Sequence, residues 1–138
     1  MKRGQISLEY LIVVSFVVFM VITLIGFSIF YTSGARDRIK INQLGNFANK
    51  LITSAETVYF AGEPSKVTIT AYLPGGVQAF SVQDNSLVFD ISTDAGVSTT
   101  AFTCSVPLDE GISFSLNEGA KKLKIEATAS EVTINEVS

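Results

Sequence analysis

Side chains suited to chemistry are few in this chain of 138 residues. It has no histidine, which removes His-based nucleophilic triads and imidazole metal ligands. No glycine-rich loop has the spacing that cradles a phosphate. A few acidic residues could surround a calcium ion, but their spacing matches no calcium loop and suits solvated turns better. These residues are Asp84, Asp90, Asp94, Asp109 and Glu110. We therefore expect no metal, no cofactor and no enzymatic activity.

The single cysteine, Cys104, alternates with Phe102 and Val106 in the sequence. This pattern predicts a small buried core residue rather than a nucleophile. One cysteine also cannot form an internal disulfide. The net charge of −3 comes without a basic stripe, which argues against a nucleic-acid partner.

The longest uncharged stretch is Leu11–Tyr31, and its nearest charges are Glu9 before it and Arg36 after it. A hydrocarbon core about 30 Å thick needs about 20 apolar residues in a helix, and this stretch supplies them. Every backbone amide in lipid must be satisfied within its own segment, so the stretch must be helical. The sequence predicts a membrane-spanning helix over residues 11–31.

The residues before that helix form a second pattern, Lys2-Arg3-Gly4-Gln5-Ile6-Ser7-Leu8-Glu9-Tyr10. Basic residues and Gly, followed by Gln-x-Ser-x-Glu-Tyr and an apolar run, resemble the class III signal peptide of archaeal type IV pilin-like proteins. The resemblance implies that a prepilin peptidase cuts between Gly4 and Gln5, removing residues 1–4. The residues that the peptidase would recognise are Lys2, Arg3, Gly4, Gln5, Ser7, Glu9 and Tyr10.

Two interpretations of Glu9 remain open. A carboxylate at the edge of an apolar helix is costly to desolvate unless a cation meets it. The resemblance implies that Glu9 meets the new α-amine of Gln5, in the same or a neighbouring subunit, and sets subunit register during assembly. Alternatively, Glu9 lies at the membrane surface near the helix N-terminus, where the macrodipole favours an anion.

The apolar segment itself has simpler explanations. A cleaved secretory signal has an apolar region of about 7–15 residues, shorter than this one. An ordinary single-span anchor fits the length equally well. Lys2 and Arg3 on one side nearly balance Arg36, Arg38 and Lys40 on the other, so the positive-inside rule does not decide orientation. A cytoplasmic N-terminus and an outside C-terminal domain are what the resemblance implies.

After the apolar segment, apolar residues recur at helical spacing from Arg36 to Phe60. The stripe comprises Ile41, Leu44, Phe47, Ala48, Leu51, Ile52, Ala55, Val58 and Tyr59. We predict one long helix from about Ser7 to about Phe60, within an N-terminal helical region that we assign to residues 5–60. It ends at Ala61-Gly62-Glu63-Pro64, with Gly at the C-cap and Pro beyond.

The remaining residues, 65–138, follow a period of two, with turn residues between short runs. The predicted strands are Lys66–Leu73, Val77–Val82, Leu87–Ser92, Val97–Val106, Ile112–Leu116, Lys122–Thr128 and Glu131–Glu136. About seven short strands predict a small antiparallel sandwich or curled sheet, with the amphipathic helix covering its open side. The expected fold class is α+β, like that of type IV pilins.

The resemblance implies a structural subunit of an archaeal type IV pilus-like surface filament that mediates adhesion. Its expected partners are other copies of itself in a helical filament, the prepilin peptidase, an assembly membrane protein and an ATPase. The chain would lie in the membrane before assembly and outside the cell afterwards. The alternatives are a minor pilin, or a single-span membrane-anchored extracellular binding domain that does not polymerise. A rotating filament of the archaellin kind fits less well, because archaellins lack the Gln-x-Ser-x-Glu run.

Overall fold

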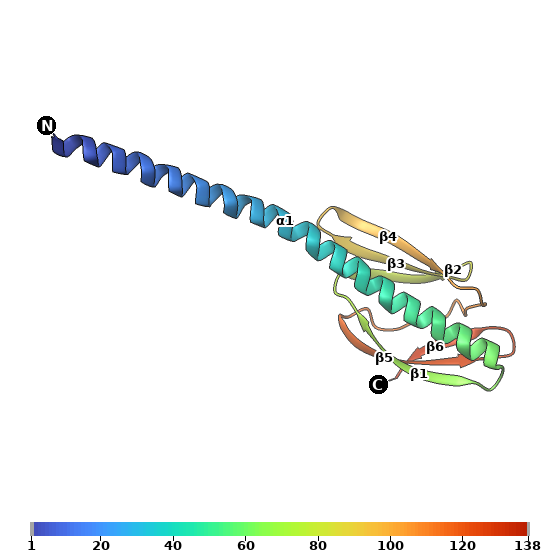
Figure 1. Ribbon diagram of the computed structural model, residues 1–138. Coiled ribbons are helices and arrows are strands. Elements are labelled where there is room, and N and C mark those ends of the chain that lie inside the picture. Colours follow the sequence, from blue (N-terminus) through green and yellow to red (C-terminus); the bar gives the residue numbers. More distant parts are fainter. Residues whose placement is uncertain (1, 138) are drawn as a thin grey trace. The chain divides into compact units, whose positions relative to one another are not determined.

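The computed structural model describes residues 2–137, and in its helix the side chains of Lys2, Arg3 and Ser33 lie outside the description. These residues form one helix and six strands, which Figure 1 labels: α1 (Lys2–Ala61), β1 (Lys66–Leu73), β2 (Val77–Gln83), β3 (Ser86–Thr93), β4 (Gly96–Thr103), β5 (Gly119–Ala127) and β6 (Val132–Glu136). The chain divides into two compact units, one ending at Arg36 and the other beginning at Asp37. Helix α1 contributes to both units.

The second unit contains two antiparallel sheets of three strands each, in the orders β1-β5-β6 and β2-β3-β4. Strands β2, β3 and β4 form a meander of consecutive hairpins. Strand β1 instead pairs with β5, and Leu73 lies opposite Gly119. The whole meander lies between these two strands in the sequence. The fold is α+β, with a long N-terminal helix and a small antiparallel β-domain, as the sequence predicts.

Several of the expected strands differ from the observed ones. Strand β5 begins at Gly119 rather than Lys122, and the other starts and ends not named below differ by one residue at most. Ile112–Leu116 is not a strand and makes only an isolated parallel bridge, between Ser113 and Asn135. The ladder stops there because the Ser115 amide donates to the Glu136 carboxylate, at 2.8 Å, rather than to a backbone carbonyl. Strand β4 ends at Thr103 rather than Val106, because its partner β3 begins at Ser86. The Cys104 amide donates to the Asn85 carbonyl, and Asn85 already belongs to the β2–β3 turn. The β-domain therefore has six strands among the described residues.

Turn residues end the elements where the sequence predicts. Helix α1 stops at Ala61, and Gly62 has a φ of +83°, a left-handed conformation that glycine adopts without steric penalty. Asp84 and Asn85 have φ values of +47° and +60°, which are typical of a two-residue type I′ hairpin between β2 and β3.

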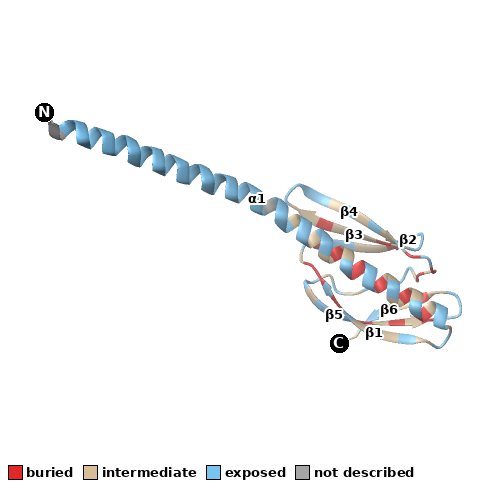
Figure 2. Cartoon of the chain, viewed as in Figure 1, coloured by how far each residue is buried: buried red, intermediate tan, exposed pale blue. Residues whose placement is uncertain are grey.

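The hydrophobic core lies entirely within the second unit (Figure 2). The helix contributes Leu44, Phe47, Ala48, Leu51, Ala55 and Val58, all buried. Both sheets face this stripe, and the largest buried side chains of the strands are Leu73, Leu87, Phe89, Ile91, Leu123, Ile125 and Ile134. Ile41 was predicted to belong to the stripe, but its side chain is 38% exposed because no strand covers it.

Candidate functional site

The first unit presents an apolar surface with no covering. Every side chain described between Gly4 and Arg36 is exposed. The exposed fractions of Phe16, Phe19 and Phe27 are 67%, 69% and 68%. Figure 2 shows this part of α1 in the colour of exposed residues. Burying a large apolar side chain is favourable by about 1.5–3 kcal/mol, so this surface needs lipid or other apolar helices around it.

Helix α1 is long and apolar enough near the N-terminus to cross a membrane. Two of its threonine hydroxyls are compatible with lipid because each is satisfied within the helix. The Thr23 hydroxyl donates to the Phe19 carbonyl, and the Thr32 hydroxyl donates to the Ser28 carbonyl, each at 2.8 Å. Such bonds to the preceding turn avoid unsatisfied donors in a medium without water.

The residues of the predicted cleavage site lie in the first turns of α1. Gly4, Gln5, Ser7, Glu9 and Tyr10 are all exposed. Apart from its chain neighbours and the adjacent helix backbone, nothing described lies within 4 Å of the position that a Gly4 Cβ would occupy. Gln5 and Glu9 are four residues apart and therefore share one face of the helix. The side chains of Lys2 and Arg3, the basic part of the motif, lie outside the described residues.

Glu9 has no ion-pair partner among the side chains that the structure describes. The pairs seen there join Lys121 to Glu136 and Lys124 to Glu126, both in the β-domain. Glu9 is thus an exposed carboxylate at one end of an apolar surface, free to meet a cation supplied from elsewhere.

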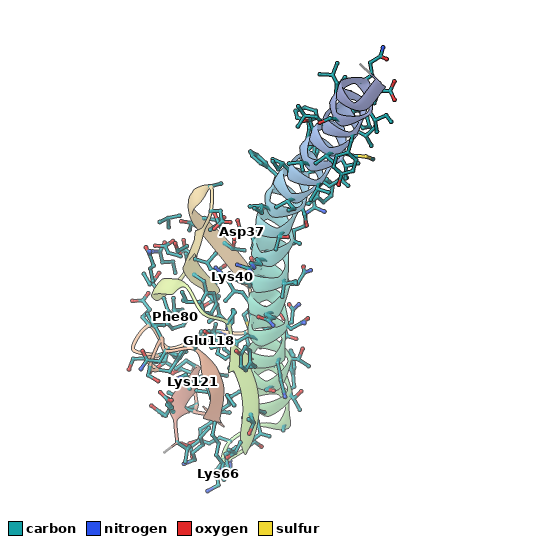
Figure 3. The ribbon with its side chains drawn as sticks, turned by 90° about the vertical axis from the view of Figure 1, so that its left-hand side faces the viewer. Asp37, Lys40, Lys66, Phe80, Glu118 and Lys121 are labelled. Carbon is teal, nitrogen blue, oxygen red and sulfur yellow. The ribbon has the colours of Figure 1, made fainter. Side chains whose placement is uncertain are left out.

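A polar cluster in the second unit joins Ser115, Lys121 and Glu136, and Figure 3 labels its lysine. The Lys121 ammonium, with a side chain only 9% exposed, donates to the Ser115 hydroxyl, and that hydroxyl donates to Glu136 at 3.0 Å. The cluster ties segment 112–116 to β6.

The cluster also changes the pKa of the Glu136 carboxyl group. Hydrogen bonds from the Ser115 amide and hydroxyl hold the pKa of the Glu136 carboxyl below its usual value, and the Lys121 charge acts in the same direction. Tyr72 shows the opposite effect, because its hydrogen bond to the Glu118 carboxylate, at 2.7 Å, raises its pKa. Both are local surface interactions rather than signs of a catalytic centre.

The carboxylates considered for calcium are not brought together. Asp84 lies in the β2–β3 turn, Asp90 accepts from the Thr99 hydroxyl at 2.6 Å, and Asp109 accepts from the Gly111 amide. Among residues 2–137, no group of three or more potential ligands is placed to hold a metal ion.

Cys104 is 3% exposed, which confirms it as a core residue. Burial raises the pKa of its thiol and so disfavours the reactive thiolate.

Two polar contacts between α1 and the β-domain had no signal in the sequence. Glu56 accepts from the Ser105 hydroxyl, and Asp37 accepts from the Asp94 amide at 2.9 Å.

Comparison with models of protein families, with curated proteins and with solved structures finds no significant match to this chain. Any functional assignment must therefore come from the chain's own residues.

Proposed function

We propose that this chain is the structural subunit of an archaeal type IV pilus-like surface filament. One observation carries the proposal: an uncharged and wholly exposed helical segment, 11–31, follows the motif from Lys2 to Tyr10 and leads into a folded β-domain. Lipid alone explains the exposed segment, but it does not explain the residues before it. The motif adds a reason for the peptide bond after Gly4 to be recognised and cut.

In this proposal the prepilin peptidase cuts between Gly4 and Gln5 while the apolar segment is in the membrane. The cut removes two positive side chains and creates a positive α-amine at Gln5, one helical turn from Glu9. An unpaired charge in an apolar interior is strongly unfavourable, so subunits that fail to pair Glu9 with an amine are rejected. Glu9 then acts as a register device rather than as a source of net stability.

An assembly membrane protein and an ATPase would move the subunit from lipid into the filament. The apolar helices exchange lipid contacts for contacts with one another, so little hydrophobic free energy is lost in the transfer. The β-domains form the filament surface and mediate attachment. A minor pilin at the filament tip has the same features and differs in abundance in sheared filaments.

The competing function is a membrane-anchored extracellular binding domain that does not polymerise. The same exposed segment favours it, since one helix of this length satisfies its surface in lipid alone. In that case the N-terminus stays uncut, and the chain is a monomer in mild detergent unless its β-domain associates.

The first test is peptide mass spectrometry of the N-terminus of the membrane-associated chain in cells that contain the peptidase. A chain that begins at Gln5 supports the proposal, whereas a chain that still begins at Met1 supports the anchored domain.

The second test compares Glu9→Ala with Glu110→Ala, which removes an exposed carboxylate from the β-domain. We expect Glu9→Ala to reduce filament yield by roughly tenfold or more. The variant leaves the α-amine of Gln5 without a partner, and an unpaired charge in an apolar interior is unfavourable by several kcal/mol. Glu110→Ala should leave the yield unchanged. Equal yields from both variants would refute the role of Glu9 in register.

A further inference from the structure

Strand β4 is an unpaired edge of the β2-β3-β4 sheet. It pairs with β3 along its whole length, from Ser86 opposite Thr103 to Thr93 opposite Gly96. On its other side, no backbone hydrogen bond is formed within residues 2–137. Such an edge offers a row of free amides and carbonyls to another strand.

The other three sheet edges each carry a protective feature. Segment 107–115 lies along β6 and bridges Leu108 to Val132 and Ser113 to Asn135. Lys50 of α1 lies against β1 and donates to the Thr70 carbonyl at 2.5 Å. Strand β2 is interrupted by an irregularity between Val77 and Ala79. Covering segments, lysines and bulges are the devices by which proteins prevent unwanted strand pairing.

Strand β4 has none of these features. Its sequence, Gly-Val-Ser-Thr-Thr-Ala-Phe-Thr, contains no charge and no proline, and its register is regular throughout. The side chain of Val97 is 59% exposed, and β-branched residues make up half of the strand. In a chain that protects its other edges, this one is left open to pairing.

A groove of about 530 Å³ runs beside β4, between that strand and the polar side of α1. Its walls are Thr100 and Phe102 on β4, and Ile41, Asn42, Gly45, Asn46 and Asn49 on α1. Ile41 is the residue that the helical stripe predicted to be buried, and it is 38% exposed here. The inward side chains of a strand added to β4 would lie over this groove.

We propose that the edge of β4 pairs, antiparallel, with β4 of a second copy of this chain. Among the residues that the structure describes, a second copy offers only one edge without a covering segment, lysine or bulge, and that edge is β4 itself. The inward-facing residues of the added strand are Ser98, Thr100 and Phe102. Phe102 supplies an apolar contact for Ile41, and the hydroxyls suit the asparagine amides of the groove. Two identical edges meeting in this way form a two-fold symmetric interface.

This pairing goes beyond the proposed filament. A polar filament repeats a head-to-tail contact, whereas a two-fold contact closes after two copies. The β4 pair would therefore join subunits of neighbouring filaments rather than subunits within one. A single strand pair is a small interface, but many copies along two filaments act together and multiply its strength.

The test is sedimentation of the full chain in mild detergent over a range of concentrations, with two matched variants. Ala101→Lys puts a charge on the exposed face of β4, and Ala79→Lys makes the same change at an exposed position on β2, the opposite edge. We expect the wild type to form dimers. Ala101→Lys should raise the dimer dissociation constant by about tenfold or more, because each copy brings a like charge to the pair. Ala79→Lys should leave it unchanged.

Circular dichroism checks that both lysine variants remain folded. A cysteine scan tests the β4 pairing independently of these variants. With Cys104 replaced by alanine, single cysteines at Val97, Thr99, Ala101 and Thr103 should cross-link two copies most strongly at the position nearest the two-fold axis. A monomeric wild type, a dimer equally insensitive to both lysines, or a uniform absence of cross-links would overturn the proposal. Because the dimer is measured in detergent, its presence does not depend on filament assembly. If the chain forms dimers but no filaments, only the proposed function is refuted. If the chain forms filaments but stays monomeric in detergent, only this inference is refuted.

Discussion

The two units of this chain use one helix in opposite ways. Between Gly4 and Arg36 every described side chain of α1 is exposed, including aromatic ones such as Phe27. From Leu44 to Val58 the same helix buries one stripe against two sheets and leaves its remaining faces largely polar. The second unit therefore contains its own stabilising core, whereas the first depends on lipid or on other copies for burial. In the proposed filament, assembly would change the surroundings of the first unit without disturbing the fold of the second.

The largest difference between the units should appear when phenylalanine is removed from each. Phe89 is fully buried and its ring lies near those of Phe47, Phe80 and Phe102. Phe89→Ala should lower the free energy of unfolding of the β-domain by about 3–5 kcal/mol, through lost burial and a cavity. Phe27→Ala, in the first unit, should leave it unchanged within about 0.5 kcal/mol.

Chemical denaturation of the full chain in detergent, followed by circular dichroism, measures both variants. Equal losses would show that the two units unfold together, and the contrast between them would be wrong.

An added carboxylate should affect membrane insertion when it is placed in the first unit, and not when it is placed in the second. Val21→Asp puts a carboxylate near the middle of segment 11–31 and should oppose membrane insertion by about 2.5–3.5 kcal/mol. Val97→Asp makes the same change at an exposed valine of the β-domain. The fraction of chain that resists carbonate extraction from membranes should fall for Val21→Asp alone. A similar fall for Val97→Asp would mean that the β-domain also holds the chain to the membrane.

The smallest expected effect concerns acid stability, which should arise in the second unit. Since the Glu136 pKa is lower in the folded state than in the unfolded chain, its ionised form stabilises the fold. This contribution is complete above the usual glutamate pKa of about 4.3 and disappears as the pH falls through the lower folded value. Glu136→Gln should therefore flatten the loss of stability in that acidic window.

The measurement is the denaturation midpoint between pH 6 and the acid limit, with Glu110→Gln as the control. An unchanged acid dependence in Glu136→Gln would show that the Ser115 contacts do not persist in solution.

The sequence predicts much of this fold because its strong signals are local. Strand β1 occupies the predicted residues Lys66–Leu73, since clean alternation and the Pro74-Gly75-Gly76 turn define it without help from elsewhere. The helix end at Ala61 follows from Gly62 in the same way. Cys104 is buried as its alternation with two apolar neighbours indicates.

What the sequence does not reveal depends on contacts between distant residues. Ile112–Leu116 alternates like a strand, and Ile112 is indeed buried, but the carboxylate of Glu136 takes the backbone amide that a ladder would need. The stripe pattern includes Ile41, and only the placement of β4 decides that nothing covers it. The pattern from Lys2 to Tyr10 that predicts cleavage can be recognised in the sequence alone. The open edge of β4 becomes visible only when all four sheet edges are compared.

The order of strands has a consequence for synthesis. Strand β1 pairs only with β5, and the whole β2–β4 meander lies between them in the chain. A chain made from its N-terminus can form the meander from local hairpins as soon as they emerge, while β1 must wait. Until β5 emerges, the apolar face of β1 has only the helix for cover. The vulnerable interval in the life of this protein therefore falls between the emergence of Leu73 and that of Gly119.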